Sequence, residues 1–134
     1  MSRGNSLKAP EGRHTVMLKG IAIGYSDLEE VDSSLGRARG VFRPGIGYEL
    51  VQPVFKLYTD AVPTPGGDVS DAEKLARYHK SRDALGLSLE DDAGRAVRTT
   101  AIHIADYTHL NRGTIELEAL ISDTDYWKKR SKDQ

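Results

Sequence analysis

The alternation of hydrophobic and polar positions along the chain predicts mainly β-structure. Residues 15–25 are expected to form a strand with Met17, Ile21 and Ile23 on one face and mainly small residues on the other. Residues 95–107 and 114–122 are also strand-like, and 114–122 alternates apolar and polar positions. A shorter strand is expected over residues 85–90, and the sequence DDAG that follows it fits a tight turn. Strands joined by such turns favour an antiparallel sheet.

Two segments, residues 26–36 and 70–86, carry the signals of short helices instead. In each of them apolar residues recur at helical spacing and a glycine stands where the helix would end. Each also begins with a serine followed three residues later by a glutamate, which is the pattern of a capping box: Ser26 with Glu29, and Ser70 with Glu73.

Residues 45–60, GIGYELVQPVFKLYTD, change their hydrophobic phase in the middle. The apolar residues before Gln52 share one face of an extended chain, and those after Pro53 share the opposite face. A proline removes a donor from a strand ladder, and a β-bulge moves every following side chain to the other face. We therefore expect one long bent strand with a bulge at Gln52 or Pro53. The alternatives are a bulge that directs Gln52 into a site, and two separate strands.

The order of elements is strand, helix, strands, helix, strands. The expected fold class is α+β, with a mainly antiparallel, bent or partly barrel-like sheet, two short helices and polar terminal arms. We expect an N-terminal arm over residues 1–13, a single globular α+β domain over residues 14–127 and a basic C-terminal tail over residues 128–134. Neither end has a core-forming pattern, so neither is expected to contribute much to folding.

Composition and charge narrow the classes of function. A chain of 134 residues fits one domain, and a formal net charge of −1 argues against nucleic acid as a partner. The absence of cysteine excludes disulfides, thiolate metal sites and cysteine nucleophiles. No apolar stretch has the length of a signal peptide core or a membrane span, so we expect no membrane partner. The expected location is the cytoplasm or, for a viral protein, the host cytoplasm or the virion.

The segment around residues 99–113 contains the side chains most suited to a site. His103, Asp106 and His109 are candidate metal ligands by type, but in an extended strand the two histidines lie ~20 Å apart and the aspartate points the other way. We therefore expect no metal, and no cofactor or catalytic set is nominated. His103 and Tyr107, together with Tyr48, could line a polar pocket.

Two basic clusters are candidate partner-binding surfaces. In the first, three arginines surround an aromatic residue and would point the same way in an extended chain: Arg37, Arg39 and Arg43 around Phe42. In the second, an aromatic residue precedes three cations: Trp127, Lys128, Lys129 and Arg130. Guanidinium groups on one face can hold carboxylates or phosphates through two hydrogen bonds each. The alternative for both clusters is solubilising surface charge.

The segments IAIGYSDLEEVDSSLG and DALGLSLEDDAGRAV give an element order that resembles the two strand–helix–strand modules of the vicinal-oxygen-chelate enzymes. The resemblance implies a metal held by His and Glu residues from several strands. The sequence offers no matching set of ligands, so no family is assigned.

The leading hypothesis is a non-enzymatic protein of interaction or assembly, such as a phage or virus particle component or a subunit of another large complex. Its partner would be another protein or further copies of itself. The alternative is a small-molecule binding protein or enzyme with a pocket in the curled sheet. A third hypothesis is a regulatory domain that adds a strand to one partner.

Overall fold

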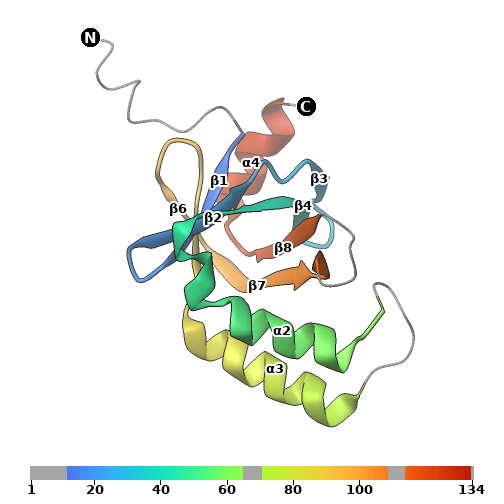
Figure 1. Cartoon of the computed structure of the whole chain (residues 1–134). Coiled ribbons are helices and arrows are strands. Elements are labelled where there is room, and N and C mark those ends of the chain that lie inside the picture. The colour runs from blue at the N-terminus through green and yellow to red at the C-terminus, as the bar shows by residue number, and fades with distance from the viewer. Residues whose placement is uncertain (1–11, 65–70, 109–113, 134) are drawn as a thin grey trace.

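The computed structural model describes residues 12–64, 71–108 and 114–133. Within these ranges the strands are β1 (His14–Leu18), β2 (Ile21–Ser26), β3 (Glu30–Asp32), β4 (Arg37–Pro44), β5 (Ser88–Glu90), β6 (Ala96–Val97), β7 (Thr99–Asp106) and β8 (Ile115–Ile121). The helices are the 3-10 helix η1 (Ile46–Leu50) and the α-helices α2 (Gln52–Ala61), α3 (Ala72–Leu85) and α4 (Thr124–Asp133) (Figure 1).

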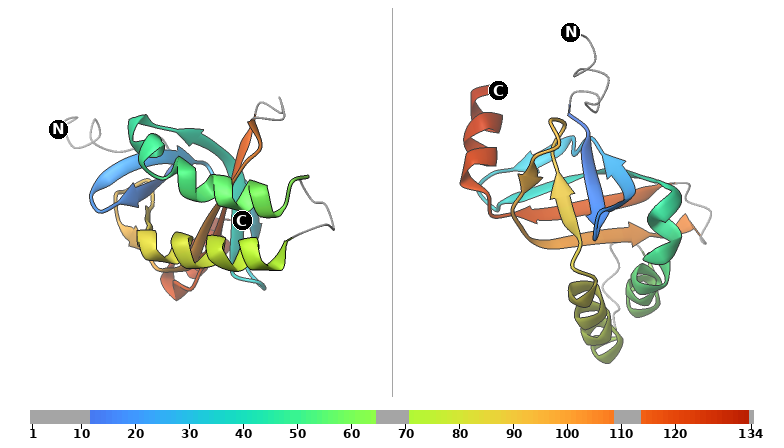
Figure 2. Two further views of the ribbon diagram at one scale, coloured as in Figure 1. Left: turned by 60° about the horizontal axis from the view of Figure 1, so that its bottom comes forward. Right: turned by 90° about the vertical axis from the view of Figure 1, so that its left-hand side faces the viewer.

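The strands form one antiparallel sheet that curls into a nearly closed barrel (Figure 2). The strand order is β6-β5-β1-β2-β4-β8-β7, and β3 pairs with the first half of β4. The two ends of this order, β6 and β7, are separated in the chain by Arg98 alone, so the sheet bends back toward its own start. The expected α+β fold with a bent, partly barrel-like antiparallel sheet is confirmed.

The inward faces of the strands fill the barrel. Alternate residues of β4, β7 and β8 are buried, as expected for strands with one face on a core. Together with side chains of β1, β2 and β5 they form the core inside the barrel: Val16, Ile23, Ala38, Phe42, Leu89, Ile102, Ile104, Leu117, Ala119 and Ile121. At one end of the barrel η1 contributes Tyr48, whose ring centroid lies 5.4 Å from that of Phe42. The helices α2 and α3 lie side by side below β7 in Figure 1.

Residues 15–25 form a hairpin, so the prediction of one continuous strand is wrong. Lys19 and Gly20 connect β1 to β2, and both have positive φ, 48° and 86°. Two such residues in succession form the turn whose twist suits a two-residue hairpin. The alternation continues through the turn, which is why the sequence pattern shows no break there.

Residues 26–36 form a loop, the short strand β3 and a turn, so the prediction of a helix is also wrong. The Oγ of Ser26 accepts a hydrogen bond from the backbone amide of Leu28, which has a φ of 46°. Glu29 accepts from the amide of Val41 on β4 instead of reaching back to Ser26. The capping-box residues are therefore used, but to hold a loop against the sheet.

Residues 46–61 are helical, so the prediction of a bent strand with a bulge is wrong. Pro53 lies in the first turn of α2, where its missing N–H costs no hydrogen bond because the first amides of a helix have no partner within the helix. The hydrophobic phase changes between Tyr48 and Phe55 because the 3-10 helix η1 ends and the α-helix α2 begins between these two residues. Both side chains are buried in the core.

The second predicted helix is confirmed as α3, which ends before Gly86 in the left-handed conformation. Its N-cap is Asp71, one residue later than expected: the Asp71 carboxylate accepts from the amides of Glu73 and Lys74, both at 3.1 Å. Ser70, the predicted cap, lies outside the described residues. The strand predicted over residues 114–122 is confirmed as β8, and the strand predicted over residues 85–90 is shorter, covering Ser88–Glu90 as β5. The single strand predicted over residues 95–107 is wrong, because the chain divides at Arg98 into β6 and β7, which lie at opposite ends of the strand order. DDAG forms the β5–β6 turn.

Replacing Asp71 with alanine is expected to lower the free energy of unfolding by about 1 kcal/mol, because two amides at the start of α3 lose their acceptor. Replacing the same residue with serine, which also caps helices, should recover most of this loss. Urea unfolding of the three proteins gives the comparison. Equal midpoints for the alanine and wild-type proteins would show that this cap does not stabilise the helix.

The basic C-terminal segment is part of a third α-helix, so the expected boundary after Trp127 falls inside α4. The Tyr126 hydroxyl lies 3.1 Å from Nε2 of His14, and Nε1 of Trp127 donates to the carbonyl of Ile121. Nη2 of Arg130 donates to the carbonyl of Leu28. The start of α4 therefore packs on the barrel, at the end away from α2 and α3 (Figure 2). Arg130, beyond the expected boundary, also contacts the domain, whereas the small contribution of the tail to folding stays a prediction.

Candidate functional site

The structure brings the predicted pocket residues close together but uses their polar atoms inside the protein. The Tyr48 hydroxyl donates to Oδ2 of Asp106 at 2.8 Å, and the Tyr107 hydroxyl donates to the carbonyl of Val62. His103 is hydrogen-bonded through Nδ1 to the Tyr78 hydroxyl, and the Tyr58 ring stands between His103 and Tyr107. His103, Tyr58, Tyr78 and Tyr107 form a packed aromatic cluster between β7 and the helices.

His103 is held neutral by its surroundings. Burial lowers the pKa of His103 to about 4, and the neighbouring cationic groups Arg82 and His79 act in the same direction. The ring packs edge-on against Tyr58, with 4.3 Å between the ring centroids. A neutral imidazole buried among aromatic rings contributes to packing, and it has no proton to donate as an acid near neutral pH.

Acid is expected to destabilise the protein through His103. The unfolded chain takes up this proton near pH 6.5 and the folded protein only near pH 4, so stability is complete above pH 6.5 and falls as the pH drops toward 4. The loss is roughly 3 kcal/mol at most. In a His103→Asn variant, which retains an acceptor for Tyr78, unfolding free energy should fall less over this range. Residual dependence is expected, since His14 is also buried with a lowered pKa. An unchanged pH profile would contradict the assignment.

Asp106 is the buried carboxylate at the end of β7, and donors surround it. Oδ1 accepts from the amide and the hydroxyl of Thr108, and Oδ2 accepts from Tyr48. Burial alone would raise the pKa of Asp106, but these hydrogen bonds and one from Gln52 together hold it below 3.8. Burial also raises the pKa of Tyr48, and the bond to the carboxylate adds to that shift. Asp106 is therefore ionised at neutral pH, and its hydrogen bond to Tyr48 holds β7 against η1.

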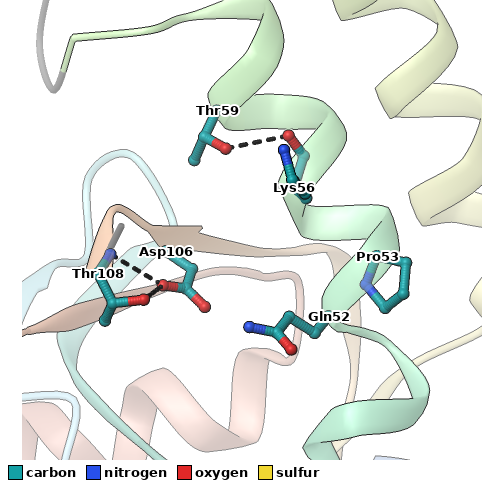
Figure 3. A pocket seen from close by; sticks show the side chains of 6 residues that line it. All are labelled: Gln52, Pro53, Lys56, Thr59, Asp106 and Thr108. Carbon is teal, nitrogen blue, oxygen red and sulfur yellow. Dashed lines mark hydrogen bonds between the residues drawn. The ribbon is translucent and has the colours of Figure 1, made fainter. Parts of the chain in front are cut away.

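A pocket of about 310 Å³ opens beside this carboxylate, lined by Gln52, Pro53, Lys56, Thr59, Asp106 and Thr108 (Figure 3). Gln52 extends from the start of α2 toward Asp106 in this view. The Thr59 hydroxyl is used within the helix, where it donates to the carbonyl of Lys56. Lys56 lies 3.2 Å from Asp60 and its side chain is 70% exposed. The sequence had suggested Gln52 as a possible site residue, and a helix start, not a bulge, places it there.

No metal centre is formed by the described part of the chain, where no three His, Asp or Glu residues are grouped so that they could hold an ion. His109, one of the ligand types weighed from the sequence, lies outside the described residues. His103 is committed to Tyr78.

The arginines of the first basic cluster share one surface, as expected for a strand. Arg37, Arg39 and Arg43 lie on the outward face of β4. Phe42 points the other way and is 2% exposed, so its prediction as a partner-binding residue is corrected: it belongs to the core. In a strand, neighbours in sequence point to opposite faces, and an aromatic side chain flanked by arginines is therefore buried when the arginines are not.

Carboxylates flank these arginines on the neighbouring strands. The register places Arg39 between Glu30 on β3 and Glu118 on β8, and Arg37 lies diagonally from Glu118. The ion-pair distances are long, 3.9 Å for both Arg37–Glu118 and Arg39–Glu30, and the side chains are partly exposed. We call the outward residues over which these two strands are paired the β4–β8 face: Arg37, Arg39, Val41, Glu116, Glu118 and Leu120. Arg43 lies beyond the paired part of β4.

The β4–β8 face also contains two exposed apolar side chains. Val41 is 40% exposed and Leu120 is 37% exposed. Val41 is paired with Glu116 in the register, and Leu120 with Arg37, so the apolar residues stand at the two ends of the charged rows. The arrangement combines apolar surface with both signs of charge within a few residues of two adjacent strands.

The second basic cluster is divided by the helix that contains it. Trp127 packs on the core and is half-buried, and Arg130 lies over the Tyr126 ring while bonding to Leu28. Lys128 and Lys129 are exposed and remain available to a partner. Trp127 and Arg130 are therefore primarily contacts of α4 with the barrel.

The class defined by this fold and site is an α+β protein with a nearly closed antiparallel barrel. Comparison with known proteins adds no name to that class, since no family model, curated protein or solved structure matches the chain. Among the described residues no helix combines the length and apolar character needed to cross a membrane.

Proposed function

We propose that the protein is a non-enzymatic interaction and assembly protein that associates with copies of itself through the β4–β8 face. The observation that carries this proposal is the row of arginines on β4 directly beside the row of glutamates on β8. The buried polar groups support the non-enzymatic part, because Asp106, His103 and Tyr48 are all bound to internal partners.

A surface with two adjacent rows of opposite charge is complementary to itself. A two-fold axis that runs along the strands, between β4 and β8, would place β4 of each copy over β8 of the other. Arg39 of one copy then faces Glu118 of its partner, and the exposed Val41 and Leu120 are covered at both ends. Such an isologous contact needs only one type of surface patch.

The outer surface of a barrel is convex, so this contact is expected to be small and weak and to depend on charge. Added salt should weaken it, because exposed charges are screened over ~8 to 10 Å at physiological ionic strength. Sedimentation velocity over a range of protein and salt concentrations measures this directly. A protein that stays monomeric at low salt up to millimolar concentration would contradict self-association.

The charge-reversed protein Arg37→Glu/Arg39→Glu is expected to be monomeric where the wild type associates, since both rows of its β4–β8 face are then acidic. The variant should unfold within about 2 kcal/mol of the wild type, because each exposed pair contributes only about 0.2–1 kcal/mol. Lys128→Glu/Lys129→Glu is the matched control, with the same change of charge on exposed residues of α4. Equal loss of association in the control would mean that net charge or the lysines of α4, and not the β4–β8 face, determine the association.

The second candidate function is binding of a small polar ligand in the pocket beside Asp106. The pocket offers the amide of Gln52 and the ammonium of Lys56 next to a fixed carboxylate. A fragment screen by NMR would support this function if compounds shift the signals of Gln52 and Thr108 and not those of the β4–β8 face.

A further inference from the structure

Two arginines, one of them from the first basic cluster described above, lie close to one aromatic ring on the outer surface of the barrel, where β1, β2 and β4 meet. The guanidinium carbon of Arg13 lies 3.8 Å above the centre of the Tyr25 ring. Tyr25 on β2 pairs directly with Arg43 on β4, so the side chains of these two residues stand on the same face of the sheet. One aromatic ring therefore has an arginine against its face and another at the neighbouring position.

Arg13 and Arg43 differ from Arg37 and Arg39 in having no acidic partner within the described residues. Arg37 and Arg39 each have a carboxylate at 3.9 Å, whereas no carboxylate in the described ranges lies within ion-pair distance of Arg13 or Arg43. Nε of Arg13 is buried and has no hydrogen-bond acceptor among the described residues. Asp92 accepts a hydrogen bond from the backbone amide of Gly12. Glu90 on β5 pairs with Thr15, on the opposite side of β1 from Tyr25.

We propose that Arg13, Tyr25 and Arg43 form a binding site for a phosphate group. Two guanidinium groups offer more donors than a carboxylate can accept in one plane, and the oxygens of a phosphate dianion can be shared between both. Stacking on Tyr25 restricts the Arg13 side chain before the ligand arrives, so less conformational entropy is lost on binding.

The ligand is a single compact phosphate group, free or as a monoester, and not a nucleic acid. Glu30 on β3 and Glu116 and Glu118 on β8 flank the rest of β4, and they would repel the successive phosphates of a polynucleotide. The formal net charge of −1 gives no general attraction for a polyanion. A single phosphate group between Arg13 and Arg43 does not extend along these rows, although the register places Glu116 diagonally from Arg43.

The test is an NMR titration of the full chain with inorganic phosphate near pH 7.5, where the dianion predominates, with chloride exchanged to keep ionic strength constant. Saturable shifts are expected at the amides of Tyr25 and Arg43. The Arg13→Gln/Arg43→Gln variant should bind about tenfold more weakly or not at all. Tyr25→Leu, which removes the platform of Arg13, should also weaken binding. Arg98→Gln is the control, because Arg98 is exposed but already faces Asp123 at 3.8 Å.

Three outcomes decide the proposal. Saturable binding that is lost in the Arg13 and Arg43 variant supports it, and a parallel titration with O-phosphoserine then shows whether an ester or the free ion is preferred. Equal binding of malonate, a dicarboxylate of the same charge, would overturn the assignment to phosphate. Shifts that do not saturate, or that persist in the folded double variant, would overturn the site itself. Thermal unfolding confirms that each variant is folded.

Discussion

Replacing Gly24 with alanine is expected to lower the free energy of unfolding by about 3 kcal/mol, a large share of the stability of a domain of this size. An added Cβ at this position in β2 would lie 2.6 Å from the carbonyl oxygen of Arg43 and would overlap the edge of the Phe42 ring at Cζ and Cε1. Neither can yield easily, since one is backbone at the β2–β4 junction and the other is fixed in the core.

Gly45 provides the matched control for this substitution. It lies beside the same strand, with its amide bonded to the carbonyl of Ile23, but an added Cβ there would meet its nearest atom at 3.5 Å, an ordinary contact. Gly45→Ala should therefore unfold close to the wild type. Chemical denaturation of both variants gives the comparison. Similar stability for Gly24→Ala and the wild type would show that β2 and β4 do not approach as closely as described.

The Asp106→Ala substitution is expected to cost about 3 kcal/mol, because it removes the acceptor of several donors and leaves the Tyr48 hydroxyl buried without its partner. Tyr48→Phe removes only one of these hydrogen bonds and should cost less, about 1–2 kcal/mol. Both values come from urea unfolding near pH 7.

The pH dependence of the Asp106→Ala variant separates charge from packing. The pKa of Asp106 is lowered on folding, so its carboxylate stabilises the wild type above pH 3.8, and this contribution is lost as the pH falls below that value. The difference in stability between wild type and variant should therefore shrink in acid. A difference that is constant down to pH 3 would mean that the ionised form of Asp106 is not the stabilising one.

The elements predicted correctly from the sequence are those whose signal is both local and repeated. Residues 114–122 alternate without interruption, and β8 has one buried and one exposed face as expected. The helix α3 combines helical spacing with a capping residue and with Gly86 at its end. In these segments the hydrophobic period and the end signals favour the same structure, and tertiary contacts do not change the outcome.

The segments predicted wrongly carry signals that two structures share. A proline is compatible with a strand edge and with the first turn of a helix, and Pro53 occupies the second of these. A serine hydroxyl can accept a hydrogen bond from a backbone amide two or three residues later either at the start of a helix or within a loop. Ser26 accepts from the amide of Leu28 within a loop. Lys19 adopts a positive φ that its side chain gives no reason to expect.

The candidate sites were recovered only in part, because each depends on contacts between distant strands. The common face of Arg37, Arg39 and Arg43 follows from alternation along one strand and could be predicted. Their carboxylate neighbours depend on the β3–β4 and β4–β8 register, which no local pattern specifies. Arg13 was assigned to an N-terminal arm, and its stacking on Tyr25 becomes visible only once β1 and β2 form a hairpin.

The central claim, that two rows of opposite charge make the β4–β8 face self-complementary, is tested most directly by mixing two variants. Arg37→Glu/Arg39→Glu has only acidic rows, and Glu116→Arg/Glu118→Arg has only basic rows, so each alone should be monomeric. In the mixture, each row of one variant faces a row of opposite charge on the other.

Sedimentation velocity of the separate and mixed variants at low salt is the deciding measurement, with thermal unfolding to show that both are folded. The proposed face predicts monomers for each variant alone and a one-to-one complex in the mixture that salt dissociates. Association of either variant alone at the wild-type level, or no complex in the mixture while the wild type self-associates, would contradict it.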